Sequence, residues 1–394
     1  MNFMFPIIAL PQNASALERG RLYGQAAAAR IRHSVHTYAK LFAFCGIDWA
    51  TACQRAQRYA AVITQLDPAL MEEMQGIAEG SHWRLDDILA LNCRTEILPP
   101  NFLSDDKHQA ETALAANRLA GLLDWEPRVP LDPHIQDGEC TAMCVQGRVS
   151  ADGQTWFAQN WDWIGRQREA LVVLQTYDAN GRALTTLTEA GMLAKIGMNA
   201  AGFALGLNIL RSPRDGVMPG VPVHVLLRYL LGCDSIAHAR EQLNHLSVLG
   251  FGAASNVPCA DANGEVACFE VAPAGWAELA PENGVVVHTN HFICDALRAE
   301  QSPMGLALSS EPRLKTAQRH ARQNGLNAEK LQTFLRDESD GFLSICRNPD
   351  PALPPEGRVE SIAGILMNTQ TRQIWIAPNV PSQVAFEEIK SAWS

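Results

Sequence analysis

The hydrophobic pattern of the chain changes its period at Cys140, and this change most constrains the fold. Apolar residues before it recur at helical spacing, so residues 14–100 are expected to be mostly helical. After Cys140, short β-rich runs are separated by turn sequences such as Ala179-Asn180-Gly181, which favours many short strands. Helical patterns return after residue 310. Strands between two helical regions indicate an α+β fold in which helices cover a sheet core.

The same patterns predict individual elements. N-terminal helices are expected over Ser15–Tyr38, Trp49–Leu66, Pro68–Ile77 and Leu85–Leu98, with a break at Glu79-Gly80-Ser81. Strands are expected over Thr141–Val149, Thr155–Trp163, Ala170–Tyr177, Ala183–Thr188, Phe203–Leu210, Ala253–Ala260, Val266–Ala272, Val285–Thr289, Ala363–Asn368 and Gln373–Ala377. Later helices are expected over Val221–Leu231, Ser235–Leu246, Arg313–Gln323 and Ala328–Leu335.

Residues 99–139 separate the helical part from the strands and are interpreted as an exposed connector. Prolines at 99, 100, 127, 130 and 133 frame an Ala-rich segment, Gln109–Leu123, that would form a short helix. Exposed connectors of this kind are where chains are cut most readily. We therefore divide the chain into an N-terminal segment, 1–139, and a segment, 140–394, that begins with Cys140, and expect both to form one compact unit.

Composition excludes several classes of function. A chain with 47% hydrophobic and 19% charged residues is typical of a globular enzyme with a sizeable core. Its net charge of -10 argues against nucleic-acid partners and against binding to anionic membranes. The apolar run Met1–Leu10 lacks the features of a signal peptide, and no apolar stretch is long enough to span a membrane. Ten cysteines without CxxC spacing favour a reduced, cytoplasmic setting.

Three polar stretches beside predicted strands are the candidates for chemistry: Asp137–Ala142, Gln159–Trp163 and Ala254–Asn256. Cys140 follows a glycine-containing turn and begins a predicted strand, and Asp162 lies on the next strand. Adjacent strands joined by a turn can bring two such side chains into contact.

Each of these residues also has a purely structural interpretation. One cysteine among ten is far more often a small buried core residue. Asp162 is equally well explained as a buried carboxylate that ties strand ends together. Asn256, which follows Ser255, is by itself better explained as a turn residue.

A series of short segments, in this order, resembles the acyl-coenzyme A:6-aminopenicillanic acid acyltransferase and β-alanyl amine hydrolase family of N-terminal nucleophile hydrolases. The resemblance covers most of the chain and implies a four-layer αββα sandwich. It also implies a precursor that cleaves itself between Glu139 and Cys140. Besides the segments around Cys140 and Asp162, those that carry it are Glu18–Gly24, Gly76–Gly80, Asn92–Glu96, Thr188–Gly191, Lys195–Asn199 and His288–Phe292.

The resemblance also implies roles for individual residues. Cys140 would be the nucleophile and its freed α-amine the base, since that amine has a pKa of about 7.7–8.0. Asp162 would orient the amine and thiol, and Asn256 would donate to the oxyanion, a contact that contributes on the order of 3 kcal/mol. The family often has Gly immediately before the cysteine, whereas Glu139 stands here after Gly138, which would alter the strain or acidity of the scissile bond.

The implied reaction is acyl transfer from the amide of a small N-acyl amine or peptide-like substrate to water or an amine. The sequence has no Gly-rich phosphate-binding loop of the kind that would indicate a coenzyme. No cofactor is therefore expected, and hydrolysis is favoured. The expected partners are this small amide substrate and the two fragments of the same precursor; a homo-oligomer is left open. Two alternatives stay open: an uncut Cys-His hydrolase that uses His288 or His291, and a relative that binds small ligands without catalysis.

Weaker candidates lie elsewhere. Arg94 and Glu96 are expected to form a structural ion pair, with substrate contact as the second interpretation. Ser310 and Arg313 lie at a predicted helix start, where Ser is typically a cap and Arg313 would clamp a substrate carboxylate. His288 and His291 have no third ligand at suitable spacing, so no metal is expected.

Overall fold

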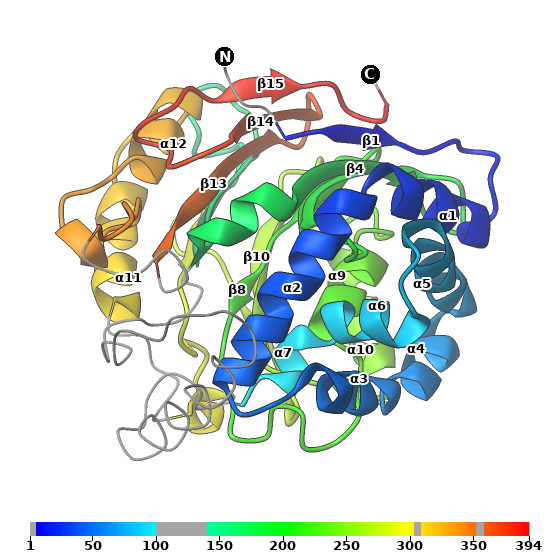
Figure 1. Cartoon of the computed structure of the whole chain (residues 1–394). Coiled ribbons are helices and arrows are strands. Elements are labelled where there is room, and N and C mark those ends of the chain that lie inside the picture. Colours follow the sequence, from blue (N-terminus) through cyan, green and yellow to red (C-terminus); the bar gives the residue numbers. More distant parts are fainter. Residues whose placement is uncertain (1–4, 100–139, 303–308, 352–357, 394) are drawn as a thin grey trace.

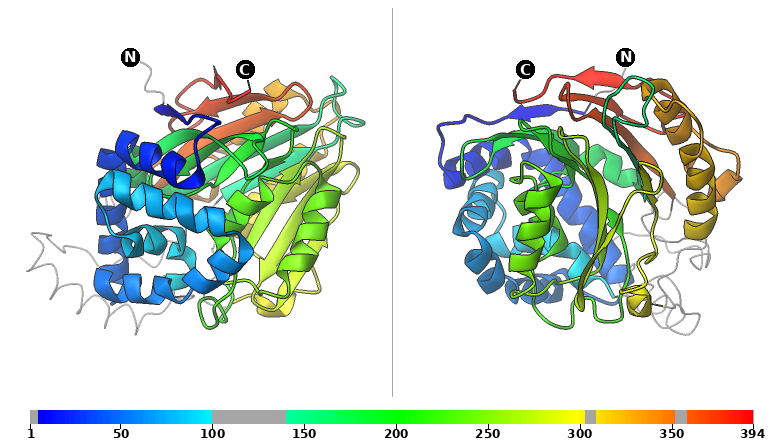
Figure 2. Two further views of the ribbon diagram at one scale, coloured as in Figure 1. Left: turned by 90° about the vertical axis from the view of Figure 1, so that its right-hand side faces the viewer. Right: turned by 180° about the vertical axis from the view of Figure 1, so that it is seen from behind.

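The computed structural model describes residues 5–99, 140–302, 309–351 and 358–393 (Figure 1). Two β-sheets face each other, and helices cover the outer face of each sheet (Figures 1 and 2). This order of layers confirms the expected α+β fold, a four-layer αββα sandwich. The predicted connector lies outside the described residues except for Pro99.

The N-terminal segment supplies most of the first helical layer. Side chains cap its helices where the sequence predicts starts: Ser15 accepts from the Glu18 N–H, and Asp67 accepts from the Ala69 N–H ahead of a helix that has Pro68 in its first turn. The helices are α1 (Ala16–Ala26), α2 (Ala28–Phe44), α3 (Trp49–Gln57), α4 (Ala60–Leu66), α5 (Pro68–Ser81), α6 (Leu85–Asn92) and α7 (Arg94–Ile97).

The break predicted at Glu79-Gly80-Ser81 is wrong, because α5 continues through Ser81 and ends at His82, which has a φ of 61°. The glycines serve close packing of α5 against α1 instead. A Cβ on Gly80 would lie 2.0 Å from the Arg21 carbonyl oxygen, and one on Gly20 would lie 2.0 Å from that of Glu73. Glycine inside the helix therefore marks a close backbone approach rather than a helix end.

The first sheet joins both segments of the chain, because β1 (Ile7–Ala9) pairs in parallel with β4. Helices α9 (Val223–Leu230) and α10 (Ile236–Leu246) lie on its outer face with the N-terminal helices (Figure 2). Its order is β1-β4-β5-β6-β7-β9-β10-β11, with β8 paired to β9. The remaining strands are β4 (Leu171–Tyr177), β5 (Ala183–Glu189), β6 (Ile196–Asn199), β7 (Ala204–Leu205), β8 (Asn208–Ile209), β9 (Ser255–Ala260), β10 (Val266–Ala272) and β11 (Gly275–Leu279).

The second sheet carries Cys140, and α11 (Ser310–Ala321) and α12 (Ala328–Leu335) cover its outer face (Figure 1). Its order is β12-β2-β3-β13-β14-β15. The strands are β2 (Cys140–Val145), β3 (Trp156–Ile164), β12 (Val285–His288), β13 (Val359–Asn368), β14 (Gln373–Ala377) and β15 (Glu387–Ile389), and 3-10 helices lie at Gly165–Ala170, Arg298–Glu300 and Gly341–Leu343.

Successive residues of β2 point alternately to the two faces of this sheet. Cys140 and its cross-strand partner Trp161 belong to the core between the sheets, whereas Met143 and Val145 pack with α12. Cys140 thus begins an interior strand of this sheet, and its side chain lies in the layer between the two sheets.

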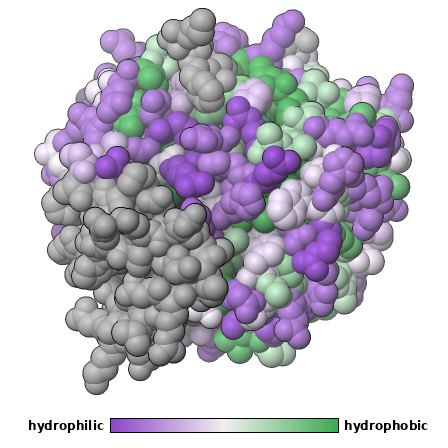
Figure 3. All heavy atoms as spheres, viewed as in Figure 1, coloured by the Kyte–Doolittle hydropathy of each residue, from purple (hydrophilic) through white to green (hydrophobic). Residues whose placement is uncertain are grey.

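The outer surface fits a protein whose apolar residues are mostly inside. On the face in Figure 3, the described residues present largely hydrophilic side chains with apolar ones scattered among them. Within the described ranges, no helix has both the length and the apolar character that crossing a membrane requires.

Candidate active site

Cys140 is held at both of its backbone groups. Its N–H donates to Asn290 Oδ1 at 2.8 Å, and its carbonyl oxygen accepts from Arg313 Nη1 at 2.7 Å. The residue is only 3% exposed. The start of β2 therefore has a fixed position in a desolvated setting.

Arg313, on α11, connects the groups around this strand start. Its Nη1 also donates to Thr141 Oγ1 at 2.8 Å, its Nη2 to Asn290 Oδ1 at 2.9 Å, and its Nε to Ser309 Oγ at 2.9 Å. Burial lowers the pKa of Arg313 to about 10, and the nearby Asp162 and Cys140 oppose this shift. The guanidinium predicted to clamp a substrate carboxylate thus remains a cation near neutral pH and binds the Cys140 strand itself.

Asp162, on β3, follows Trp161, the cross-strand partner of Cys140, and interacts electrostatically with the Cys140 thiol. Its Oδ1 accepts from Ser361 Oγ at 2.6 Å, and burial raises its pKa to about 7 against the charge of Arg313. Burial and the Asp162 carboxylate raise the pKa of the Cys140 thiol to about 11. Positive charge from Lys195 and Arg313 and a backbone hydrogen bond from Asp162 oppose that rise.

Asn256 lies on the facing sheet, where β9 pairs it with Asn208 on β8. Both residues are fully buried. The Asn256 amide has no oxygen or nitrogen partner among the described residues and interacts with the Cys268 thiol. The Asn208 amide nitrogen is likewise without a partner there, although Gln159 Nε2 donates to its Oδ1 at 2.7 Å. Buried amides normally find partners, so these two groups are candidate donors to a bound oxygen.

Asn290 is a site residue that sequence reasoning did not single out. Its Oδ1 accepts from both Cys140 and Arg313, while its Nδ2 donates to the Ile209 carbonyl at 2.9 Å. The signal was present in the segment His288–Phe292, which contributed to the family resemblance. Its role becomes visible only when the loop after β12 is placed beside Cys140.

Ser310 positions this loop instead of capping a helix. Its Oγ accepts from the Asn290 N–H at 2.8 Å and donates to Thr289 Oγ1 at 3.0 Å. Ser309 occupies the N-cap position, and its side chain makes no cap hydrogen bond. The cap prediction for Ser310 is therefore wrong, because the loop competes for its hydroxyl.

The two candidate histidines contact groups other than Cys140. His288 Nε2 lies 2.8 Å from Glu270 Oε1, and its Nδ1 lies 2.8 Å from the Thr289 carbonyl oxygen. His291 Nδ1 lies 2.7 Å from Ser310 Oγ, and burial lowers the pKa of this imidazole to about 4. No contact in the described part of the chain supports a Cys-His pair. Over the same residues, His, Cys, Asp and Glu form no cluster of three or more that would hold a metal ion.

The predicted ion pair between Arg94 and Glu96 is also wrong. Arg94 Nη2 lies 3.6 Å from Glu189 Oε2, whereas Glu96 Oε1 accepts from the Val223 N–H at 2.8 Å. Residues two apart on a helical turn point in different directions, so α7 sends these side chains to different neighbours.

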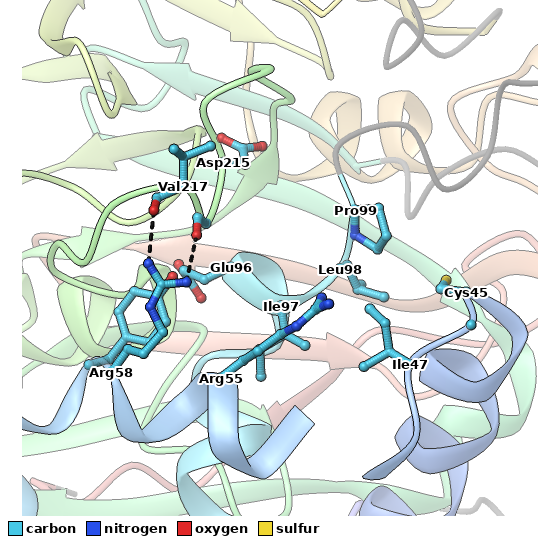
Figure 4. A pocket seen from close by; sticks show the side chains of 13 residues that line it. Cys45, Ile47, Arg55, Arg58, Glu96, Ile97, Leu98, Pro99, Asp215 and Val217 are labelled. Carbon is cyan, nitrogen blue, oxygen red and sulfur yellow. Dashed lines mark hydrogen bonds between the residues drawn. The ribbon is translucent and has the colours of Figure 1, made fainter. Parts of the chain in front are cut away.

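Glu96 lines a cavity of about 580 Å³ between the helical layer and the loop after β8 (Figure 4). Arg58 reaches across it, and its Nη2 donates to the Val217 carbonyl at 2.8 Å. The lining residues are Cys45, Gly46, Ile47, Arg55, Arg58, Tyr59, Glu96, Ile97, Leu98, Pro99, Asp215, Gly216 and Val217. None of the three predicted catalytic residues is among them.

Two comparisons of the sequence with known proteins find the same family. The sequence profile of the family described as acyl-coenzyme A:6-aminopenicillanic acid acyl-transferase matches residues 149–382. The acyl-coenzyme A:6-aminopenicillanic-acid-acyltransferase 40 kDa form of Emericella nidulans is 28% identical over 294 residues, which are 73% of this chain and 69% of that protein.

Solved structures also match parts of the chain. Penicillin V acylase from Agrobacterium tumefaciens has 14% identity and a TM-score of 0.34, over 61% of this chain and 83% of that one. A variant of conjugated bile acid hydrolase from Clostridium perfringens has 10% identity and a TM-score of 0.39, over 64% of this chain and 97% of that one.

Proposed function

The chain belongs to the acyl-coenzyme A:6-aminopenicillanic acid acyl-transferase family, and from this premise we propose that it is a self-cleaving cysteine amidohydrolase. Its substrate is the amide of a small N-acyl amine or a peptide-like molecule. The observation that carries the proposal is the anchoring of Cys140 at the start of β2 by Asn290 and Arg313, with Asp162 alongside.

The first proposed step frees the nucleophile. In the uncut chain the Cys140 nitrogen is an amide, which cannot act as a base. The Cys140 sulfur attacks the carbonyl carbon of Glu139, the carbon–nitrogen bond breaks, and the departing nitrogen takes up a proton. Water then hydrolyses the resulting thioester and releases two fragments. Glu139 itself lies outside the described residues.

The second proposed step acts on the substrate amide. The new α-amine has an ordinary pKa of about 7.7–8.0, so it can take the thiol proton near neutral pH. The sulfur attacks the substrate carbonyl, the amine half leaves with that proton, and water releases the acyl group. The Asn256 amide has no oxygen or nitrogen partner among the described residues, which supports its role as the oxyanion donor, and Asn290 would keep the amine oriented.

Covalent trapping tests this assignment. A panel of N-acyl p-nitroanilides is mixed with wild type and with Cys140→Ala, and p-nitroaniline release and intact mass are followed. We expect a burst of release from wild type and an acyl mass on the Cys140-containing fragment, with neither in the variant. Turnover by Cys140→Ala would contradict the nucleophile, and absence of any acyl mass across a broad panel would favour the non-catalytic alternative.

A further inference from the structure

Lys195 is a buried cation that reaches the strand pair carrying Cys140. It precedes β6 in the first sheet, and its Nζ lies 3.8 Å from the centroid of the Trp161 ring. Trp161 is the cross-strand partner of Cys140, so its ring and the thiol share one face of the second sheet. Lys195 thus crosses the space between the sheets toward the nucleophile.

The charges around Lys195 do not balance within their own cluster. Lys195 Nζ lies 3.3 Å from Glu189 Oε2, and Arg94 Nη2 lies 3.6 Å from the same oxygen. Tyr38 donates its hydroxyl hydrogen to the other oxygen of this carboxylate. All of these side chains are buried. Two cations therefore share one carboxylate, which leaves one surplus positive charge where desolvation makes an unbalanced charge costly.

The other described titratable groups place no second carboxylate beside Lys195. Glu96 interacts with Arg94, and burial raises the pKa of this carboxyl to about 7. His224 on α9 is fully buried, and its pKa lies well below the ordinary value because of burial and of the charges of Arg94 and Lys195. Burial raises the pKa of Asp162 on β3 to about 7, and the positive charge that opposes this rise is that of Arg313. Among the described residues, the Cys140 thiol is in electrostatic contact with Lys195, and each favours the charged form of the other.

We propose that Lys195 is a positioning residue for Cys140, whose thiolate it stabilises as the counter-charge across the space between the two sheets. This inference rests on the proposed function, in which Cys140 is the nucleophile. The counter-charge acts in the uncut chain, where the Cys140 nitrogen is an uncharged amide, and in the cut chain, where the α-amine must be neutral to take the thiol proton. Burial lowers the pKa of Lys195 to about 7, against the opposing charge of Glu189, so charge at this site changes near neutral pH.

The test is the pH dependence of Cys140 alkylation by iodoacetamide, followed by mass spectrometry of the Cys140-containing peptide because the chain has ten cysteines. In Lys195→Met the apparent pKa of the thiol should rise by roughly one unit, which slows alkylation at pH 7 about tenfold. Lys195→Arg should keep the wild-type profile. Arg228→Met removes a buried cation that lies 3.2 Å from Glu73, in the helical layer, and should leave the profile unchanged.

If the pH dependence of alkylation in Lys195→Met matches that of wild type, Lys195 is not the counter-charge of the thiolate. Turnover by wild type and its loss in Cys140→Ala would still support the proposed function in that case. A similar shift of the apparent thiol pKa in Arg228→Met would assign the effect to general destabilisation and would also overturn the proposed role of Lys195. Should Lys195→Met fail to fold, Lys195→Gln retains a donor for Glu189 and carries the same expected shift.

Discussion

The backbone N–H of Cys140 donates a hydrogen bond of 2.8 Å to Oδ1 of Asn290, a residue 150 positions later in the chain. This nitrogen belongs to the proposed scissile bond and then becomes the proposed base. The Arg313 guanidinium donates to the same oxygen at 2.9 Å, so the acceptor itself is held in place. One side chain thus fixes the atom on which both proposed steps depend.

Replacing Asn290 with Ala should therefore affect cleavage and turnover together. The Cys140 N–H and one Arg313 nitrogen lose their shared acceptor, and an unpaired buried donor costs about 1–3 kcal/mol. We expect cleavage and p-nitroaniline release each to slow by about tenfold or more. Time courses of fragment formation and of release measure this.

Asn199→Ala is the matched control. Its buried amide donates to the carbonyls of Leu231 and Cys233 and accepts from the backbone N–H groups of Ala201 and Phe203, away from Cys140. It should lower stability and leave the rate of cleavage by folded protein unchanged. Equal slowing in both variants would assign the Asn290 effect to folding.

Asn256→Ala should separate activity from stability. Its amide has no oxygen or nitrogen partner among the described residues, so its removal should change the free energy of unfolding by less than about 1 kcal/mol. Loss of an oxyanion donor should lower kcat about a hundredfold or more. Denaturant titration and steady-state kinetics on the same preparation measure both quantities.

Asn160 provides the opposite case on the second sheet. Its Nδ2 donates to the carbonyls of Leu335 at 2.8 Å and Ile345 at 3.0 Å. Asn160→Ala should cost about 1–3 kcal/mol of stability. An Asn256→Ala protein that loses stability yet keeps its kcat would show that Asn256 is structural.

Strand adjacency explains why part of the site was predictable from sequence. Cys140 and Asp162 lie on neighbouring strands, so the connection between these strands fixes their proximity. Elements with a clear local pattern were also predictable: the strand over Val266–Ala272 and the helix over Ala328–Leu335 have the predicted bounds. Asn290 and Lys195 join the site only through tertiary packing of a distant loop and of the facing sheet. Both residues lie in segments that carry the family resemblance, but the helix and strand pattern of the sequence does not indicate that they reach Cys140.

The failed predictions have the same physical origin. Arg94 finds its carboxylate on β5, so a nearby acidic residue in sequence was a poor guide to its partner. The short strands β1, β6, β11 and β15 were not predicted, since three to five residues carry little periodicity. Neighbouring strands in the sheets, rather than local pattern, determine these elements.

The buried Glu96 carboxyl should make the free energy of unfolding depend on pH. Burial raises its pKa from 4.5 to about 7. Between these values the folded protein keeps the proton while the unfolded chain loses it, so stability falls as pH rises through this window. Relative to Glu96→Gln, wild type should lose on the order of 2–3 kcal/mol between pH 4.5 and pH 7.5.

Denaturant titrations of both proteins at several pH values measure this difference. Glu96→Gln should keep wild-type cleavage and kcat within about twofold, since none of the predicted catalytic residues lines the cavity beside Glu96. A difference in stability that is constant with pH would contradict the buried, protonated carboxyl, and a large loss of kcat would place Glu96 in the active site.

The central claim is that the chain cuts itself before Cys140, and intact mass with N-terminal sequencing under denaturing conditions tests it most directly. Wild type should yield two fragments, one beginning at Met1 and one at Cys140, while Cys140→Ala should remain a single chain of 43.0 kDa. A wild-type protein that hydrolyses amides while its chain stays whole would contradict the account.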